Sequence, residues 1–162
     1  MHDSPRRLAP HEVEAVAALA RTVWQATYPA LISQAQIDAM LAARYAVERI
    51  HAQLGDPRQA WWVLGAPPVA FAHACMDGDI CKLDKLYVHP ARQRAGLGAS
   101  LFDAVRVWAR AQGATRLRLQ VNRGNSRAIR AYERYGLRIV ESRVFDIGGG
   151  FVMDDHIMEA PL

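Results

Sequence analysis

The middle of the chain constrains the fold most, because its hydrophobic periodicity changes in a fixed order. Residues 69–76 and 80–88 are apolar, alternating runs separated by a turn around Gly78, which is typical of an antiparallel hairpin. The dipeptide His-Pro ends the second run. Residues 97–112 then place apolar side chains at helical spacing, with Gly113 after them. The order strand, strand, helix is therefore predicted.

The flanking segments extend this order in both directions. The patterns predict helices at 11–28, 33–54 and 125–135, strands near 6–10 and at 59–64 and 115–121, and a final hairpin of 137–147 with 151–160. Two strand-helix-strand units follow Ile80, and they require at least one parallel strand pair. The sequence predicts an α+β class, with one domain spanning residues 1–162, a mixed and mostly antiparallel sheet, and about four flanking helices.

Composition limits the class of protein. The 162 residues, 51% of them hydrophobic, suffice for one core. No apolar run reaches the roughly 18 residues of a membrane span, and the first residues lack a secretory apolar stretch, so we expect a cytoplasmic protein with no membrane partner. Cys75 and Cys81 form neither a disulfide scaffold nor a zinc spacing, so no metal site is expected.

Positive charge is concentrated in the second half of the chain. Between Arg92 and Arg143, twelve arginines stand against Asp103, Glu133 and Glu141, a balance of +9 in a protein of net charge +4. Such a segment either forms solvated faces or attracts a polyanion, which means a phosphate-rich cofactor or nucleic acid. Because the arginines are spread over several predicted elements without a recognition helix, we expect no nucleic-acid partner.

The segment "RQRAGLGASL" lies between the predicted strand and helix. Gly96 and Gly98 match neither a dinucleotide fingerprint nor a P-loop, and by themselves they could simply ease a turn. A helix that begins here, however, leaves its first N–H groups unpaired beside Arg92 and Arg94. These residues predict a site for a cofactor that carries a bisphosphate.

A second set of residues follows at helical spacing. Asn125, Ala128 and Tyr132 share one face of a predicted helix, and Gly136 stands just beyond its end. A purely structural interpretation is also open, with an N-cap, a core aromatic residue and a helix-ending glycine.

Together the two segments resemble the Gcn5-related N-acetyltransferase (GNAT) superfamily. The first is similar to its Q/R-x-x-G-x-G/A motif and the second to its N-x-x-A-x-x-x-Y-E-x-x-G-F motif, with Leu137 in place of the usual Phe. The matching residues are Gln93, Gly96, Gly98, Asn125, Ala128, Tyr132, Glu133 and Gly136. The predicted order of elements is also that of the family.

The resemblance implies an N-acetyltransferase that moves the acetyl group of acetyl-CoA to a primary amine in a ternary complex. Two parallel strands, ending at Val88 and Val121, would splay apart around the pantetheine arm. The implied cofactor residues are Leu86, Tyr87, Val88, Gln93, Arg94, Ala95, Gly96, Leu97, Gly98, Ala99, Ser100, Asn125, Ala128 and Tyr132. Tyr132 would be the general acid, because a phenol of pKa about 10 can protonate a departing thiolate.

The general base is less directly implied. Many relatives carry a Glu five residues before the motif Asn, where this chain has Gln120. We expect Asp84 to replace it, on the same side as Leu86 and Val88 if strand alternation holds. The alternative is a surface ion pair with Lys82 or Lys85. Weaker candidates are Asp154, Asp155 and His156 on the last strand, or bulk water.

The acceptor is the least constrained part. The stretches "LDKLYV" and "GGGFVMDDHIM" most resemble the subgroup that contains bacterial polyamine acetyltransferases. This resemblance favours a polyamine-like small molecule, with Trp24, Tyr28, Asp84, Asp154 and Asp155 as substrate residues. For the aromatic residues among them, a position in the core is the favoured explanation. Other interpretations are a protein N-terminal or lysine acetyltransferase, and a non-catalytic module that binds acetyl-CoA or nucleic acid. The terminal hairpin is compatible with a homodimer.

Overall fold

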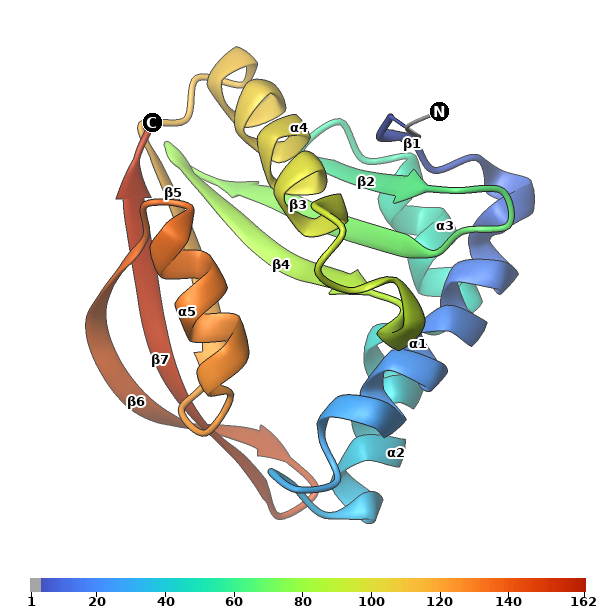
Figure 1. Cartoon of the computed structure of the whole chain (residues 1–162), viewed down its shortest axis with the longest axis vertical. Coiled ribbons are helices and arrows are strands. Elements are labelled where there is room, and N and C mark those ends of the chain that lie inside the picture. Colours follow the sequence, from blue (N-terminus) through green and yellow to red (C-terminus); the bar gives the residue numbers. More distant parts are fainter. Residues whose placement is uncertain (1–3) are drawn as a thin grey trace.

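Residues 4–162, which a computed structural model describes, form a seven-stranded sheet in the order β1-β2-β3-β4-β5-β7-β6 (Figure 1). The predicted domain begins at residue 1, and residues 1–3 lie outside the described part. The strands are β1 (Arg6–Arg7), β2 (Gln59–Leu64), β3 (Ala70–Asp77), β4 (Ile80–Val88), β5 (Arg116–Asn122), β6 (Arg138–Gly148) and β7 (Phe151–Pro161). The predicted α+β class and mostly antiparallel sheet are confirmed.

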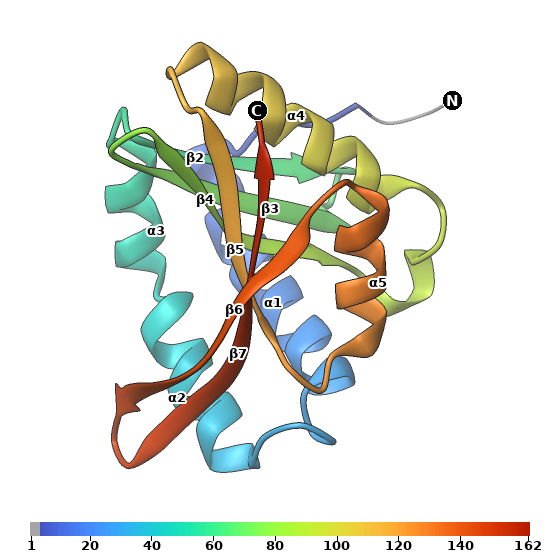
Figure 2. The ribbon, with the colours of Figure 1, turned by 90° about the vertical axis from the view of Figure 1, so that its left-hand side faces the viewer.

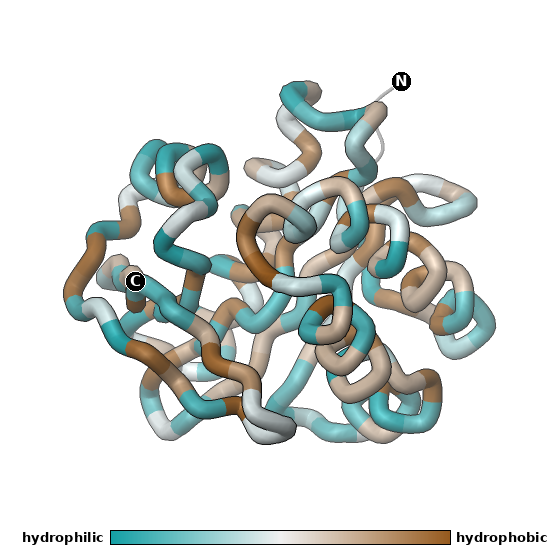
Figure 3. Tube along the Cα trace, turned by 90° about the horizontal axis from the view of Figure 1, so that it is seen from below, coloured by the Kyte–Doolittle hydropathy of each residue, from teal (hydrophilic) through white to brown (hydrophobic). Residues whose placement is uncertain are grey.

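Five α-helices in the described residues cover the sheet. They are α1 (Val13–Thr27), α2 (Gln34–Arg44), α3 (Val47–Leu54), α4 (Leu97–Ala111) and α5 (Ser126–Arg134). Figures 1 and 2 show α1 to α3 on one face of β2 to β4 and α4 on the other, with α5 beside β5 to β7. None of the helices described is long and apolar enough to cross a membrane, and Figure 3 shows hydrophilic residues interspersed along them.

The predicted helix at 33–54 is wrong, because the chain leaves helical geometry in its middle. Tyr45 ends α2 with φ −123°, and Ala46 is extended before α3 begins. Tyr45 is buried, and its hydroxyl accepts a hydrogen bond from the indole N–H of Trp24, 3.2 Å away. The break lets α3 turn to pack on β2, where Gln53 accepts from the indole of Trp61.

Two apolar cores form on the two faces of the sheet. The core under α4 and α5 includes Leu83, Leu101 and Leu119, and Leu86 and Val88 pack against it. The core under α1 to α3 is built from the other face of the same strands, with Trp24, Trp61, Phe71 and, at its edge, Tyr87. Period-two alternation along β2 to β4 supplies both cores at once.

The central parallel pair joins β4 to β5 over only three register positions. Residues 80–82 pair with residues 116–118, and beyond them the two strands share no further register positions. From Leu83 to Val88, one edge of β4 is therefore free of a neighbouring strand. The parallel pair predicted after Ile80 is confirmed.

A β-bulge changes which side of β4 Asp84 faces. Leu83 pairs with Ala74 and Lys85 pairs with His73, so Asp84 is the extra residue between two paired ones. Its carboxylate contacts His73 and Arg44, which belong to the α1 to α3 side. The expectation that Asp84 shares the side of Leu86 and Val88 is wrong, because the bulge interrupts the alternation on which it rested.

Strand β6 lies at the outer edge of the sheet and is exposed along nearly all of its length. Val140 and Val144 are its most exposed apolar residues, and neighbouring Val152 on β7 is similarly exposed. A long edge strand of this kind can pair with another chain. The homodimer stays a prediction.

Candidate functional site

A cavity of about 1060 Å³ occupies the space left where β4 and β5 separate. Its walls come from α1, α2, the second half of β4, the start of α4, α5, the end of β5 and the β6–β7 hairpin. Helix α2 also contacts the hairpin, where the Gln36 amide donates to the carbonyl of Val152 at 2.8 Å. The cavity thus connects the two faces of the sheet.

The N-terminus of α4 forms one end of this cavity. The N–H groups of residues 94–99 have no hydrogen-bond acceptor within the part of the chain that the structure describes. Gly96 (φ +79°) and Arg94 (φ +67°) both adopt left-handed backbone geometry, which turns the chain sharply ahead of the helix. Consecutive free N–H groups at the positive end of a helix dipole are a binding site for phosphate oxygens.

Gly98 keeps this end of the cavity open. A Cβ atom added there would lie 3.2 Å from the hydroxyl oxygen of Tyr135, which is tighter than ordinary contact. Any longer side chain would have to extend away from Tyr135. The glycine therefore leaves the backbone of the first helical turn accessible to a ligand.

The free edge of β4 offers further backbone groups. The N–H of His89 donates to Val69 beside β3, so the backbone of Val88 and Leu86, one and three residues earlier, faces the opposite way. The side-chain amide of Gln93 donates to the carbonyl of Val88 at 3.3 Å, which agrees with this direction. The N–H groups of Leu86 and Val88 therefore point into the gap between the strands.

Helix α5 contributes the second set of predicted residues. Asn125 caps the helix, since its Oδ1 accepts from the N–H of Ala128 at 3.3 Å. Asn125, Ala128 and Tyr132 all line the cavity. Burial, together with nearby Tyr87, raises the pKa of Tyr132 well above that of a free phenol, so its hydroxyl keeps its proton at neutral pH.

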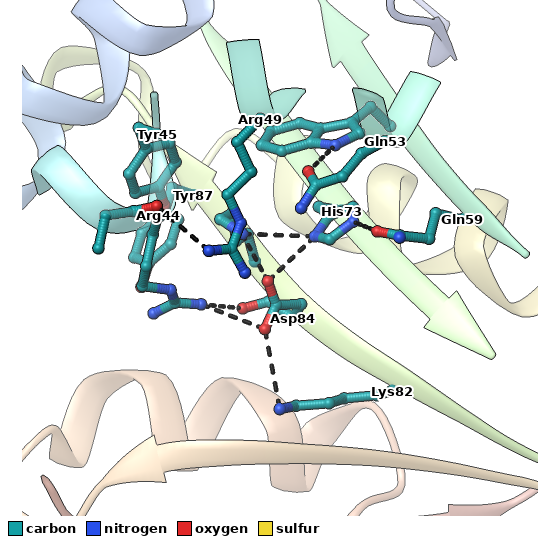
Figure 4. A network of polar contacts seen from close by, with 12 residues as sticks. Arg44, Tyr45, Arg49, Gln53, Gln59, His73, Lys82, Asp84 and Tyr87 are labelled. Carbon is teal, nitrogen blue, oxygen red and sulfur yellow. Dashed lines mark hydrogen bonds and ion pairs between the residues drawn. The ribbon is translucent and has the colours of Figure 1, made fainter. Parts of the chain in front are cut away.

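On the other side of the gap, Asp84 lies at the centre of a polar network (Figure 4). Its carboxylate contacts the Arg44 guanidinium at 3.2 Å, Nδ1 of His73 at 3.0 Å and the ammonium of Lys85. The ammonium of Lys82 lies 3.9 Å away. The predicted alternative for Asp84, a surface ion pair with Lys82 or Lys85, is wrong in one respect: the pair with Lys85 is present, but it is buried.

The network fixes the charges of its members. Burial alone would raise the pKa of Asp84, but the His73 hydrogen bond and the charges of Lys85 and Arg44 outweigh it and hold that pKa well below the usual range. Burial lowers the pKa of Lys85 to about 8, although Asp84 opposes the shift. The Lys85 side chain is 2% exposed, and its ammonium lies 5.3 Å from the Tyr45 ring centroid and 5.2 Å from that of Trp61.

Most of the predicted cofactor residues line the cavity, but not all of them do. Of the cofactor residues, Ala95 and Ser100 do not line the cavity, whereas the other twelve do. Tyr87 packs toward the α1 to α3 core, where its hydroxyl lies 2.8 Å from that of Tyr28. Their roles stay predictions.

The predicted substrate residues also divide. Trp24 and Tyr28 both line the cavity, but Trp24 is fully buried whereas Tyr28 keeps a small exposed fraction. Asp154 lies outside the cavity and pairs with Arg123 at 3.0 Å. Asp155, the next residue, is buried and lines the cavity. Alternation along β7 separates these two acidic neighbours.

Sequence reasoning missed Arg44 and His73 and treated Lys85 only as a neighbour of Asp84. Arg44 ends α2, forty residues before Asp84, and His73 lies across the β3–β4 hairpin. Neither belongs to a motif. A charged residue inside the apolar run of β4, with a histidine on the facing strand, was the available signal for a buried pair.

Comparison with known proteins places these features in a family context. The model of the acetyltransferase (GNAT) family matches residues 19–137. Uncharacterised N-acetyltransferases of Mycobacterium bovis and Mycobacterium tuberculosis are 29% identical over 151 residues, which cover 91% of this chain and 96% of each relative.

Solved structures share the fold. The PaiA N-acetyltransferase from Thermoplasma acidophilum, solved in complex with coenzyme A, has a TM-score of 0.83 and 21% identity over the whole of both chains. A GCN5-related N-acetyltransferase from Rhodopseudomonas palustris has the same TM-score at 23% identity, covering 100% of this chain and 97% of the other.

Proposed function

The chain belongs to the acetyltransferase (GNAT) family and is an acetyl-CoA-dependent N-acetyltransferase, and we propose that the primary amine of a small molecule is its acceptor. The recognised motif residues Gln93, Gly96 and Asn125 all line the cavity described above. The proposal assigns the cofactor and the acceptor to opposite ends of that cavity.

The single observation that carries the cofactor placement is the cavity between the separated strands. One end meets the free N–H groups of residues 94–99, which suit the pyrophosphate of coenzyme A. The middle is bordered by the free edge of β4, which suits an extended amide-bearing arm such as pantetheine. Tyr132 lines the same cavity on α5. The donor set therefore fits acetyl-CoA in both charge and shape.

Acetyl-CoA supplies an activated acetyl thioester. In the proposed arrangement, the N–H groups of Leu86 and Val88 orient the thioester carbonyl and stabilise negative charge on its oxygen. Tyr132 donates its phenolic proton to the departing thiolate sulfur. Its raised pKa keeps that proton in place until the sulfur becomes basic.

Asp84 as general base stays a prediction, and its ion pairs bear on it. A carboxylate held well below its usual pKa binds a proton weakly, and Arg44 and Lys85 already occupy its oxygens. The polyamine-like acceptor likewise rests on the sequence resemblance. The acidic residues that line the cavity are Asp84, Asp146 and Asp155, and of these Asp84 is already paired with Arg44 and Lys85.

The function is tested by incubating the protein with acetyl-CoA and a panel of amines, comprising spermidine, aminoglycosides, amino acids and short peptides with free N-termini. Release of free thiol is expected with at least one small-molecule amine. Acetyl-CoA at 100 times its Kd is also expected to raise the free energy of unfolding by about 2.7 kcal/mol. Turnover with the peptides alone would replace the small-molecule acceptor by a protein substrate, and no thermal shift would contradict the cofactor site.

The pyrophosphate position is tested by Gly98→Val. Because a Cβ atom at this position already meets Tyr135 at 3.2 Å, the larger side chain is expected to occupy the cavity end. We expect the Kd for acetyl-CoA, measured by calorimetry, to rise at least about tenfold, which corresponds to about 1.4 kcal/mol. The control is Gly55→Val, at the end of α3 and away from the cavity. Equal affinity of the two variants would refute this placement.

A further inference from the structure

Asp155 is a buried carboxylate with an unsatisfied oxygen inside the cavity. The residue is 3% exposed, and its Oδ1 has no hydrogen-bond partner in the described part of the chain. Asp155 also lines the cavity. Because a buried carboxylate oxygen without a partner is costly, its retention suggests a partner that arrives with the ligand.

The groups around Asp155 do not neutralise it. Its cross-strand neighbours are Asn122 on β5 and Arg143 on β6, and the Arg143 guanidinium pairs with Glu141 at 2.6 Å. From β4 and α2, Lys82 and Arg44 contribute positive charge, but both are within ion-pair distance of Asp84.

The pKa of Asp155 reflects this setting. Burial and the charge of Asp154 raise it to about 6, against the smaller opposite effects of Arg44 and Lys82. The charge of Asp155 in turn contributes to the raised pKa of Tyr87, on β4. At neutral pH the group is an ionised carboxylate, and it is a stronger base than an ordinary aspartate.

We propose that Asp155 binds the ammonium group of the acceptor and removes one of its protons before acetyl transfer. The inference rests on the proposed function, and it places the acceptor at the end of the cavity that β7 borders. It also defines the acceptor class as a primary amine that enters as a cation, with its ammonium satisfying Oδ1. Asp155 is then a catalytic residue.

The proton balance of this step is complete. The ammonium transfers one proton to the carboxylate of Asp155, which leaves the amine lone pair free to attack the thioester carbon. The new C–N bond forms and the C–S bond breaks, with its electron pair leaving on sulfur. Tyr132 protonates that sulfur and regains a proton from the attacking nitrogen, and Asp155 releases its own proton to solvent. The products are an acetamide, the free thiol of coenzyme A and one proton.

The geometry favours Asp155 over Asp84 for this role. Both Asp84 oxygens contact cations or His73, whereas Oδ1 of Asp155 has no hydrogen-bond partner in the part of the chain described. Accepting a proton at Asp84 would break its pairs with Arg44 and Lys85 and leave two charges without a partner. Asp155 makes no ion pair within 4.0 Å in the described part of the chain, so its protonation leaves no other charge without a partner.

The test compares Asp155→Asn with Asp77→Asn, using the best amine from the panel. For wild type, kcat/KM is expected to fall below about pH 6 as Asp155 takes up a proton. In Asp155→Asn this limb is expected to vanish, and kcat/KM at pH 7.5 is expected to fall at least about 100-fold. Asp77→Asn, which removes an exposed carboxylate at the end of β3, away from the cavity, is expected to keep both the rate and the limb.

A stability measurement separates catalysis from misfolding. The folded pKa of Asp155 is raised, so its charge destabilises the fold above that pKa, and the penalty disappears as pH falls through the unfolded value near 4. At pH 7, Asp155→Asn is therefore expected to melt no lower than wild type and to bind acetyl-CoA with unchanged Kd. Retention of the rate and of the pH 6 limb by Asp155→Asn would overturn the role of Asp155 alone. A wild type that binds acetyl-CoA but acetylates no amine in the panel would overturn the proposed acceptor as well.

Discussion

Tyr132→Phe is expected to lower kcat by about 100-fold or more, because the variant loses the proton donor for the departing thiolate. The ring itself remains, so packing on α5 should be retained and the Kd for acetyl-CoA should stay within about twofold of wild type. Steady-state kinetics with the best acceptor, together with calorimetry for acetyl-CoA, separates the two effects. The loss should appear in kcat and not only in KM, since the interaction is made as the C–S bond breaks.

The matched control is Tyr135→Phe, which makes the same chemical change one residue beyond the end of α5. The ring of Tyr135 stacks on Phe102 with a centroid distance of 4.8 Å, and Phe can reproduce that contact. We expect kcat to change by less than about threefold in this control. If Tyr132→Phe behaves like the control, Tyr132 does not act as the acid and the sulfur receives its proton from water.

Asp84→Asn is expected to cost about 3–5 kcal/mol of the free energy of unfolding, measured in urea at pH 7. The substitution keeps the shape of the side chain but removes the counter-charge of Lys85, which is almost completely buried, and of Arg44. The control is Asp154→Asn, whose partner Arg123 is about half exposed. This surface pair is expected to contribute about 0–1 kcal/mol.

Two further measurements check the electrostatic origin of that loss. Adding Lys85→Met to Asp84→Asn should recover at least about 1 kcal/mol, because a buried charge without a partner costs more than an apolar side chain of similar size. The folded pKa of Asp84 is depressed, so its contribution is complete above the unfolded value near 4 and is lost as pH falls toward the folded value. The difference between wild type and Asp84→Asn should thus shrink below about pH 4. A difference that stays constant with pH would argue for lost packing instead.

The prediction of the fold from sequence was strongest where local chemistry decides geometry. The hairpin of β3 and β4, the start of α4 after Gly96 and the cap at Asn125 all follow from turn residues and periodicity within a few positions. The break between α2 and α3 was not predictable in this way. Residues 33–54 have continuous helical periodicity, and the chain breaks at Tyr45 because its side chain is buried against Trp24, on a different helix.

Within the candidate site, the motif residues were predictable from local sequence, whereas the polar network around Asp84 was not. The motif residues from Gln93 to Tyr132 could be placed around one cavity because spacing along a strand and a helix fixes which side chains share a face. The bulge at Asp84 had no such signal, since alternation is the default for a strand and an inserted residue shows only in the register with β3.

The sequence by itself determined the order of the strands, the start of α4 after Gly96 and the family, because each depends on residues close together in the chain. Only the tertiary structure decided where the carboxylates stand. Pairing with Arg44, His73 and Lys85 makes Asp84 part of an ion-pair network, while the pleat of β7 turns Asp155 inward and Asp154 outward. The pKa of each group follows from burial and from partners far away in sequence, and these exist only after the sheet has formed.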